Sequence, residues 1–230
     1  MSDPAPFRTE SGATASDLTK ALKSGHCPIC SLLRDDEFQE LCRWVGDNTA
    51  NKNNRRRLDD AGGFCNYHFW RLRKVHSPFS GSLVNDFVAA KFLSSLRNPA
   101  GGDGLAHAQW LRTAAELCPL CVHLDGREAT HLRALADWFG EPSAWQEYEN
   151  SRGLCLPHLA RLQPLIDRPT LRSQLISTQV VQVERLQKEM REFRRRFETG
   201  RRWEISHDEW KAWERVIEKL VGREGARFPR

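Results

Sequence analysis

The 230-residue sequence predicts an all-α protein, a tandem duplication of a small metal-stapled helical unit, with a long C-terminal helix and a final Trp-rich helix. Two observations favour this class. A Cys-Pro-x-Cys motif followed by a Cys-x-x-His motif occurs twice, and apolar residues elsewhere recur at helical spacing. Because no segment shows the sustained alternation of a half-buried strand, we expect no sheet.

Six cysteines and two histidines form the duplicated motifs: Cys27, Cys30, Cys65 and His68 in the first copy, and Cys118, Cys121, Cys155 and His158 in the second. Between the two motifs lie 34 residues in the first copy and 33 in the second. Each copy holds three thiols and one imidazole, the donor set of a closed tetrahedral zinc site. We therefore predict two zinc sites, one in each repeat, with an iron–sulfur cluster as the alternative cofactor.

The duplication also predicts the domain organisation. We expect a disordered leader at 1–15, a first unit at 16–97, a Gly-rich linker at 98–105, a second unit at 106–199, and a C-terminal helix and tail at 200–230. Units of this size bury a limited core, and a bound metal would add folding free energy.

In the first unit, a short helix capped by Ser16 should end near Gly25. Proline is favoured at the first helical position, so a helix should begin at Pro28 with Cys27 as its cap. A short charged helix at 55–61, a helix from Cys65 to about residue 75, and a third from about 82 to 97 complete the unit.

The second unit repeats this plan, with a lead-in helix around Trp110 and Leu111, but its last helix is longer, from about 169 to 197. Apolar residues spaced 3, 4, 3 and 4 form a seam along it: Val183, Leu186, Met190, Phe193 and Phe197. Ser206 and Glu209 form a capping box for a final helix. One face of that helix carries Trp210, Trp213, Ile217 and Leu220, and Gly222 ends it.

The net charge of +5 is concentrated between residues 185 and 202, which hold eight basic and three acidic residues. The candidate contacts to nucleic-acid phosphates are Arg194, Arg195, Arg196, Arg201 and Arg202. Neighbouring aromatic residues could stack on bases. The other interpretation is a solvated helix face whose phenylalanines pack in the core of the protein.

Three further residues lie near the motifs. His26 and His123 adjoin the CxxC pairs, where we interpret them as exposed helix-start residues rather than ligands. Cys42 has no counterpart in the second repeat and stands in an apolar stretch, so we expect it to be a packing residue. No P-loop, GxSxG or HExxH motif occurs, which favours a non-enzymatic protein.

Targeting signals are also absent from the sequence. The N-terminus lacks the apolar core of a secretory signal, and no run approaches the length that spans a bilayer. We therefore predict a cytoplasmic protein that does not contact membranes, in a reducing compartment that keeps its thiols available for metal.

The arrangement GHCPIC…GGFCNYH at 25–68, echoed by LCPLC…RGLCLPH at 117–158, resembles a family of uncharacterised bacterial and archaeal proteins, a domain of unknown function. The resemblance implies a prokaryotic source and no particular activity.

The predicted function is a non-enzymatic zinc-binding helical scaffold or interaction protein. Its long C-terminal helix would bind another protein or a second copy of the chain, with nucleic acid as a further candidate partner. The alternative is a redox- or metal-responsive regulator with labile zinc or iron–sulfur sites.

Overall fold

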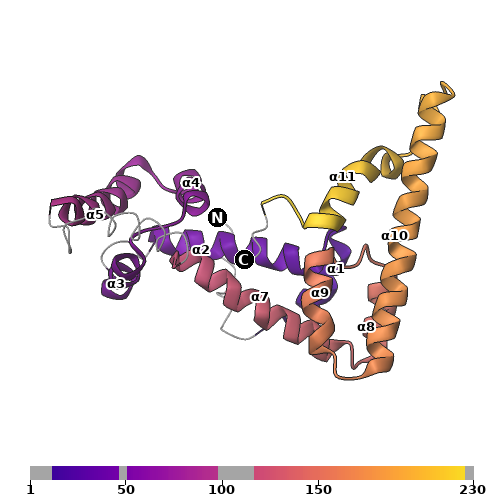
Figure 1. Ribbon diagram of the computed structural model, residues 1–230, viewed down its shortest axis with the longest axis horizontal. Coiled ribbons are helices and arrows are strands. Elements are labelled where there is room, and N and C mark those ends of the chain that lie inside the picture. Colours follow the sequence, from indigo (N-terminus) through magenta and orange to yellow (C-terminus); the bar gives the residue numbers. More distant parts are fainter. Residues whose placement is uncertain (1–11, 47–50, 98–116, 226–230) are drawn as a thin grey trace, which may run out of the picture. The chain divides into compact units, whose positions relative to one another are not determined.

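A computed structural model describes residues 12–46, 51–97 and 117–225 (Figure 1). The helices of this part are α1 (Ala15–Lys23), α2 (Pro28–Gly46), α3 (Lys52–Ala61), α4 (Asn66–Val75), α5 (Pro78–Arg97), α7 (Pro119–Trp138), α8 (Pro142–Glu149), α9 (Leu156–Leu162), η1 (Gln163–Leu165), α10 (Pro169–Glu198), η2 (Arg202–Glu204) and α11 (His207–Val221). These residues include no strand, which confirms the predicted all-α class.

Several helix boundaries follow directly from local sequence. Helices α2 and α10 both begin at a proline, the residue whose fixed φ suits the first helical position. The capping box predicted for α11 is present, since Ser206 Oγ accepts from the Glu209 N–H and the Glu209 carboxylate accepts from the Ser206 N–H. The cap of α1 is Thr14, which forms a capping box with Asp17, and not the predicted Ser16.

The chain forms two compact units, and neither coincides with one sequence repeat. The first unit contains residues 12–34 and 127–225 of the described chain, and the second contains 35–46, 51–97 and 117–126. Each unit therefore combines segments from both repeats. The division falls inside α2 and inside α7, so each of these helices begins in one unit and ends in the other.

The core of the first unit includes an aromatic cluster from the end of α7 and from α8. Phe139 stacks on Trp145 with ring centroids 4.5 Å apart and meets Tyr148 edge to face at 5.1 Å. The buried Tyr148 hydroxyl donates to Gln179 Oε1 of α10 at 2.8 Å. Residues 12–14, which the predicted leader includes, belong to this unit, since Ala13 is buried and its N–H donates to His131.

The core of the second unit contains its cysteines. Trp44, Phe64 and Leu72 pack with Cys118 and Cys121 in one buried cluster. Trp44 and Phe64 meet edge to face with ring centroids 5.0 Å apart. Two of the predicted metal ligands are thus core residues of this unit.

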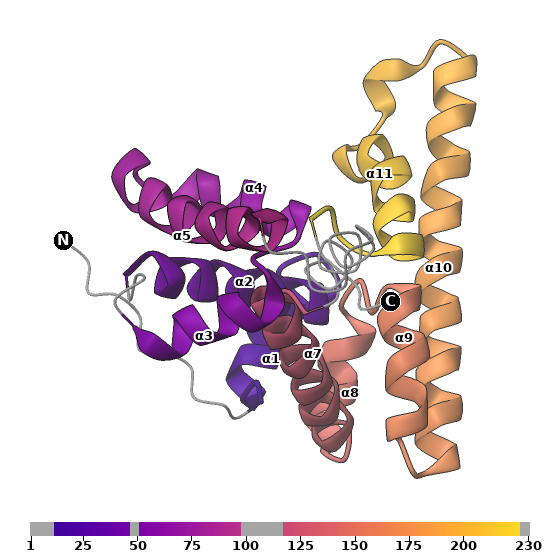
Figure 2. The same ribbon diagram turned by 60° about the vertical axis from the view of Figure 1, so that its left-hand side comes forward.

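Helices α10 and α11 form a hairpin in the first unit, and both views show α11 beside the upper half of α10 (Figures 1 and 2). Phe193 of the predicted seam meets Trp210 edge to face at 5.5 Å, and Arg196 pairs with Glu209 at 2.8 Å. Part of the seam on the long helix is therefore covered by α11 of the same chain.

Three of the sequence predictions concern residues that the structure does not describe. These are the first 11 residues of the leader, the linker at 98–105, and the lead-in helix around Trp110 and Leu111. Within the part of the chain that the structure describes, every helix is too short or too polar to cross a membrane.

Candidate metal centres

The eight predicted ligands gather into two groups of four, but the pairing of the motifs differs from the prediction. Site A consists of Cys27, Cys30, Cys155 and His158, and site B consists of Cys65, His68, Cys118 and Cys121. The CxxC motif of each repeat therefore lies with the CxxH motif of the other. The expectation of one site per repeat is wrong, and the two repeats are interleaved.

The length of the helices explains the exchange. At about 1.5 Å per residue, the 19 residues of α2 extend about 28 Å, and α7 with 20 residues is similar. Helix α2 starts at site A in the first unit and carries the chain into the second unit, where Cys65 and His68 follow. Helix α7 does the reverse, starting at site B and leading back to the unit that holds Cys155 and His158.

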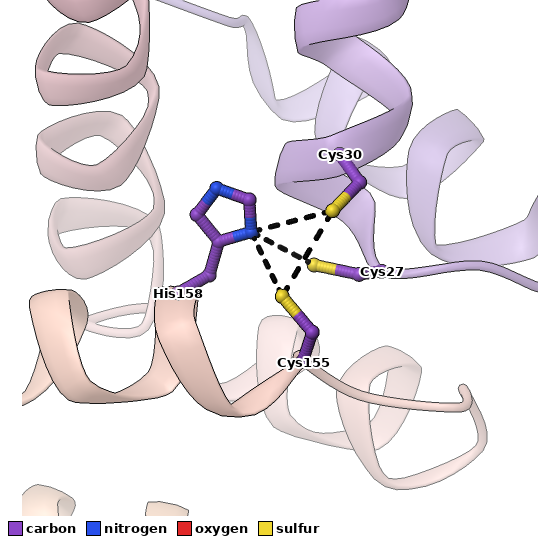
Figure 3. Close-up of side chains that lie close together, drawn as sticks. All are labelled: Cys27, Cys30, Cys155 and His158. Carbon is purple, nitrogen blue, oxygen red and sulfur yellow. Dashed lines mark hydrogen bonds between the residues drawn. The ribbon is translucent and has the colours of Figure 1, made fainter. Parts of the chain in front are cut away.

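Site A is formed by the N-terminal turns of α2 and α9 (Figure 3). Nδ1 of His158 lies 3.4 Å from Cys27 Sγ, 3.5 Å from Cys30 Sγ and 3.1 Å from Cys155 Sγ. The Cys30 and Cys155 sulfurs are 3.9 Å apart. The four side chains converge on one point and all are buried.

Site B repeats this geometry with the N-terminal turns of α4 and α7. His68 Nδ1 lies 3.3 Å from Cys65 Sγ, 3.4 Å from Cys118 Sγ and 3.2 Å from Cys121 Sγ. The Cys65 and Cys121 sulfurs are 3.6 Å apart. Cys65 is only partly buried, in contrast to the other seven donors.

These spacings suit a single tetrahedral ion. With Zn–S bonds of about 2.3 Å and Zn–N bonds of about 2.0 Å, the edges of a tetrahedron are about 3.8 Å between sulfurs and about 3.5 Å between nitrogen and sulfur. The measured edges, from 3.1 to 3.9 Å, lie close to these values. All seven cysteines are free, so disulfides do not account for the clusters.

Each donor pair occupies the first turn of a helix, as predicted. Cys65 and Cys155 are N-cap residues of α4 and α9, and α2 and α7 begin directly after Cys27 and Cys118. The cap and the third helical residue lie on the same side of the first turn, where unpaired N–H groups and the helix dipole favour thiolate over thiol. Two such helix starts meet at each site.

Glycines shape the chain just before two of these turns. Gly63 and Gly153 have φ of 117° and 68°, values that residues with a Cβ rarely adopt. A Cβ on Gly153 would also lie 1.8 Å from Gln182 Oε1. Position 153, two residues before Cys155, therefore requires glycine for both its conformation and its space.

The donors of site B have strongly shifted pKa values. A hydrogen bond with Cys118, opposed by burial and assisted by His68, lowers the pKa of Cys65 to about 4. Burial alone would lower the pKa of His68, but hydrogen bonds with Cys118 and Cys65 raise it to about 9. Without a metal ion, site B therefore holds the Cys65 thiolate beside the His68 imidazolium. A divalent cation would replace the protons that the donors carry in this state.

Site A behaves in the same way. Burial opposes ionisation of Cys27, but hydrogen bonds with Cys155, Cys30 and His158 hold its pKa well below the usual value. Burial also opposes the charge of His158, whose pKa nevertheless rises to about 11 through hydrogen bonds with Cys155 and Cys27.

A carboxylate lies behind each histidine, and we did not predict these residues from the sequence. Glu128 Oε1 lies 3.3 Å from His158 Nε2 in site A, and Glu37 Oε1 lies 3.7 Å from His68 Nε2 in site B. Both carboxylates are buried. Carboxylates behind metal-binding histidines orient the ring and fix which nitrogen faces the metal.

An arginine completes each of these outer groups. Arg161 donates to Glu128 Oε2 at 2.6 Å, and Arg71 donates to both oxygens of Glu37 at 3.2 and 3.0 Å. Glu37 and Glu128 each follow the second cysteine of a CPxC motif by seven residues, and each arginine follows its histidine by three. This equal spacing is the sequence signal that identifies them.

Helix α11 contacts both loops that lead into site A. Glu218 accepts from the Cys27 N–H at 3.4 Å and pairs with His26 Nδ1 at 2.9 Å. The buried Lys219 ammonium donates to the carbonyls of Arg152 and Leu154, at 2.6 and 2.9 Å, just before Cys155. The C-terminal helix therefore fixes the backbone on both sides of this site.

The remaining candidates lie elsewhere. His26 and His123 are not donors in either group. Cys42 is exposed and does not belong to the core, so the prediction of a packing role is wrong. It stands outside both metal groups as well.

The basic cluster is largely paired within the hairpin. Arg195 lies 2.7 Å from Glu192, and Arg201 lies 3.8 Å from Glu204. Arg196 pairs with Glu209, Arg202 stacks 3.9 Å above the Phe197 ring, and Arg194 is exposed. Contact with nucleic acid stays a prediction. These ion pairs neutralise part of the positive charge that the sequence places in this segment.

Fold and sites together define an all-α protein with two buried Cys3His groups. The chain belongs to the family described as "Family of unknown function (DUF6062)", whose model matches residues 17–227. This confirms the resemblance to an uncharacterised family. No curated protein matches the chain, and no solved structure does.

Proposed function

We propose that this protein is a non-enzymatic scaffold in which two zinc ions, one in site A and one in site B, join its helices. The observation that carries the proposal is that each donor set has the composition and spacing of one closed tetrahedral site. In each site the ion would connect helix starts from both repeats, so the two ions would hold the interleaved chain together.

The donor chemistry supports zinc over an iron–sulfur cluster. All donor atoms of a group lie within 4.8 Å of one another, which suits one central ion. A cluster of several irons and sulfides must fit between its ligands and would spread them further apart. Three thiolates and an imidazole are also a preferred set for structural zinc.

A structural role follows from the closed coordination. Four protein donors leave no position for a water molecule or a substrate on a tetrahedral ion, whereas catalytic zinc sites keep such a position. Glu37 and Glu128 would keep the histidine rings in place, and their arginines would hold the carboxylates in position. A reducing compartment such as the cytoplasm would suit six free thiolates.

One observation favours a second candidate, a redox-responsive regulator. Cys65 of site B is the donor that is not fully buried, and its pKa is lowered to about 4. A solvent-accessible, ionised sulfur is the usual point of attack for oxidants, which could release the ion from this site.

Metal analysis of protein purified without oxygen and without added metal tests the proposal. We expect about two zinc ions per chain, no visible absorption, and loss of helical structure when a strong chelator removes the zinc. Iron with sulfide and visible colour would overturn it. If mild peroxide releases one zinc reversibly both from the native protein and from Cys42→Ser, which lacks the exposed thiol outside the sites, the redox-responsive alternative gains support.

A further inference from the structure

Helix α11 carries a row of large apolar side chains that the described part of its own chain covers only in part. This α11 apolar face consists of Trp210, Trp213, Ile217, Leu220 and Val221. Each of the five is between 50% and 61% exposed. Helical spacing predicts that the first four share one face, and the structure leaves that face half open to solvent.

Other contacts also hold the hairpin together, besides the one between Trp210 of this face and Phe193 of α10. A different side of α11, on which Ala212 and Lys219 are buried, packs on α10 and on the loops of site A. Ion pairs hold the two helices together at both ends of this contact, between Arg215 and Glu189 at 2.5 Å and between Arg196 and Glu209 at 2.8 Å. The exposed half of the α11 apolar face is thus available in addition to this packing surface.

Its area matches what a stable interface requires. Large side chains have about 150 to 250 Å² of surface when fully open, so five that are half-exposed present on the order of 500 Å² of apolar area. A standard interface buries about 800 Å² on each partner, of which somewhat more than half is non-polar. The face therefore supplies the apolar share of one side of such an interface.

The charges and spacing of α11 indicate what kind of partner fits. The helix carries four acidic and three basic residues, so it is not a basic surface for anionic lipid or nucleic acid. Its apolar residues at 210, 213, 217 and 220 are spaced 3, 4 and 3, the spacing by which two helices pack along a common seam.

The helix dipole of α11 favours an antiparallel partner of the same kind. When two copies of the helix run antiparallel, their helix dipoles oppose each other, which is the favourable arrangement. Such pairing is isologous, as in most homodimers, because the same face serves both copies.

We infer that the chain forms a homodimer through antiparallel pairing of two α11 apolar faces. In this arrangement Trp213 of each copy lies beside Ile217 of the other, and Trp210 lies beside Leu220. The inference goes beyond the proposed zinc scaffold and does not depend on which metal occupies the sites.

The test uses the full-length zinc-loaded protein in sedimentation equilibrium at about 10 to 100 µM, a range that detects dissociation constants in the micromolar region. We expect the wild type to be a dimer. Trp213→Lys alone and Ile217→Glu alone should each give monomers, since each places a charge against an apolar residue of the other copy. Both positions are half-exposed, so helical content and zinc content should stay unchanged.

Mixing the two single variants makes the test specific for the antiparallel register. The antiparallel dimer contains two contacts between position 213 of one copy and position 217 of the other. In the mixed dimer, one of these contacts places the introduced ammonium beside the introduced carboxylate. The other contact keeps the native Trp213 and Ile217. We therefore expect the mixture to dimerise although each variant alone does not. The control is Val181→Lys on α10, which changes an equally exposed apolar residue outside the face and should leave the dimer intact.

Several results would overturn the inference. These are a monomeric wild type at the highest concentration, dimers that persist in both single variants, and a mixture that stays monomeric. Binding of the monomeric wild type to anionic phospholipid vesicles or to single-stranded DNA, abolished by Trp213→Lys, would assign the face to a different partner. Zinc content measured on the same samples separates any of these results from a failure of the metal sites.

Discussion

Glu128 Oε1 lies 3.3 Å from Nε2 of His158, the ring nitrogen that faces away from the three sulfurs of site A. Glu128 belongs to α7, the helix whose first turn supplies Cys118 and Cys121 to site B. Since Glu37 of α2 has the same relation to His68, each long helix gives two thiols to one site and a carboxylate to the other. The interleaving of the repeats thus extends beyond the ligands themselves.

Replacing Glu128 should weaken metal binding at site A. In Glu128→Ala the His158 ring loses the carboxylate that orients it, and changes of this kind lower metal affinity about 10- to 100-fold. Competition with a chromophoric chelator should therefore show one weakened zinc and one unchanged zinc. Two equally weakened sites would mean that Glu128 acts on overall stability and not on His158.

The loop before Cys155 should not tolerate a side chain at position 153. Gly153→Ala adds a Cβ that would lie 1.8 Å from Gln182 Oε1, so we expect a loss of more than about 1 kcal/mol of unfolding free energy and weaker metal binding at site A. Gly200→Ala is the matched control, since Gly200 also has a positive φ, of 74°, but has open space around its Cβ position. Equal losses in the two variants would show that only backbone conformation matters.

Lys219 should stabilise the same loop through its two hydrogen bonds to carbonyl groups. Lys219→Met leaves the Arg152 carbonyl without this donor, which we expect to cost about 1 to 3 kcal/mol in urea unfolding at neutral pH. Lys211→Met is the control, because Lys211 is exposed and forms only a surface pair with Glu214. A similar small effect in both variants would contradict the role of Lys219.

The pH dependence of stability gives a second test of Lys219. Burial lowers its pKa from 10.5 to about 8. Between these values the unfolded chain holds a proton that the folded protein has released, so the contribution of Lys219 to stability rises as pH increases from about 8 to 10.5. Comparing unfolding midpoints across this range should show a smaller rise in Lys219→Met than in the wild type.

The sequence predicted much of the secondary structure because the signals were local. The start of α10 at Pro169 and the Ser206 capping box each depend on a few neighbouring residues. The four Cys/His motifs at helix starts were also visible, because proline or a preceding glycine marks those turns. Ser16 was a weaker signal than Thr14, whose partner Asp17 stands three residues later.

The pairing of the motifs could not be predicted from spacing alone. A CxxC and the next CxxH in the chain are natural partners by spacing, but the long helix that follows each CxxC ends in the other unit. Which CxxH lies near a given CxxC depends on tertiary packing between segments far apart in sequence. The exposure of Trp213 and Ile217 has the same origin, because helical spacing shows that residues share a face but not what covers it.

Zinc content of two double variants tests the interleaved pairing most directly. Cys30→Ala with Cys155→Ala removes two donors from site A and leaves site B complete, so we predict about one zinc ion per chain after dialysis against a competing chelator. Cys30→Ala with Cys65→Ala removes one donor from each site, so we predict almost none. Pairing within each repeat would give the opposite pattern, with zinc retained in the second variant and lost from the first, and that result would contradict this account.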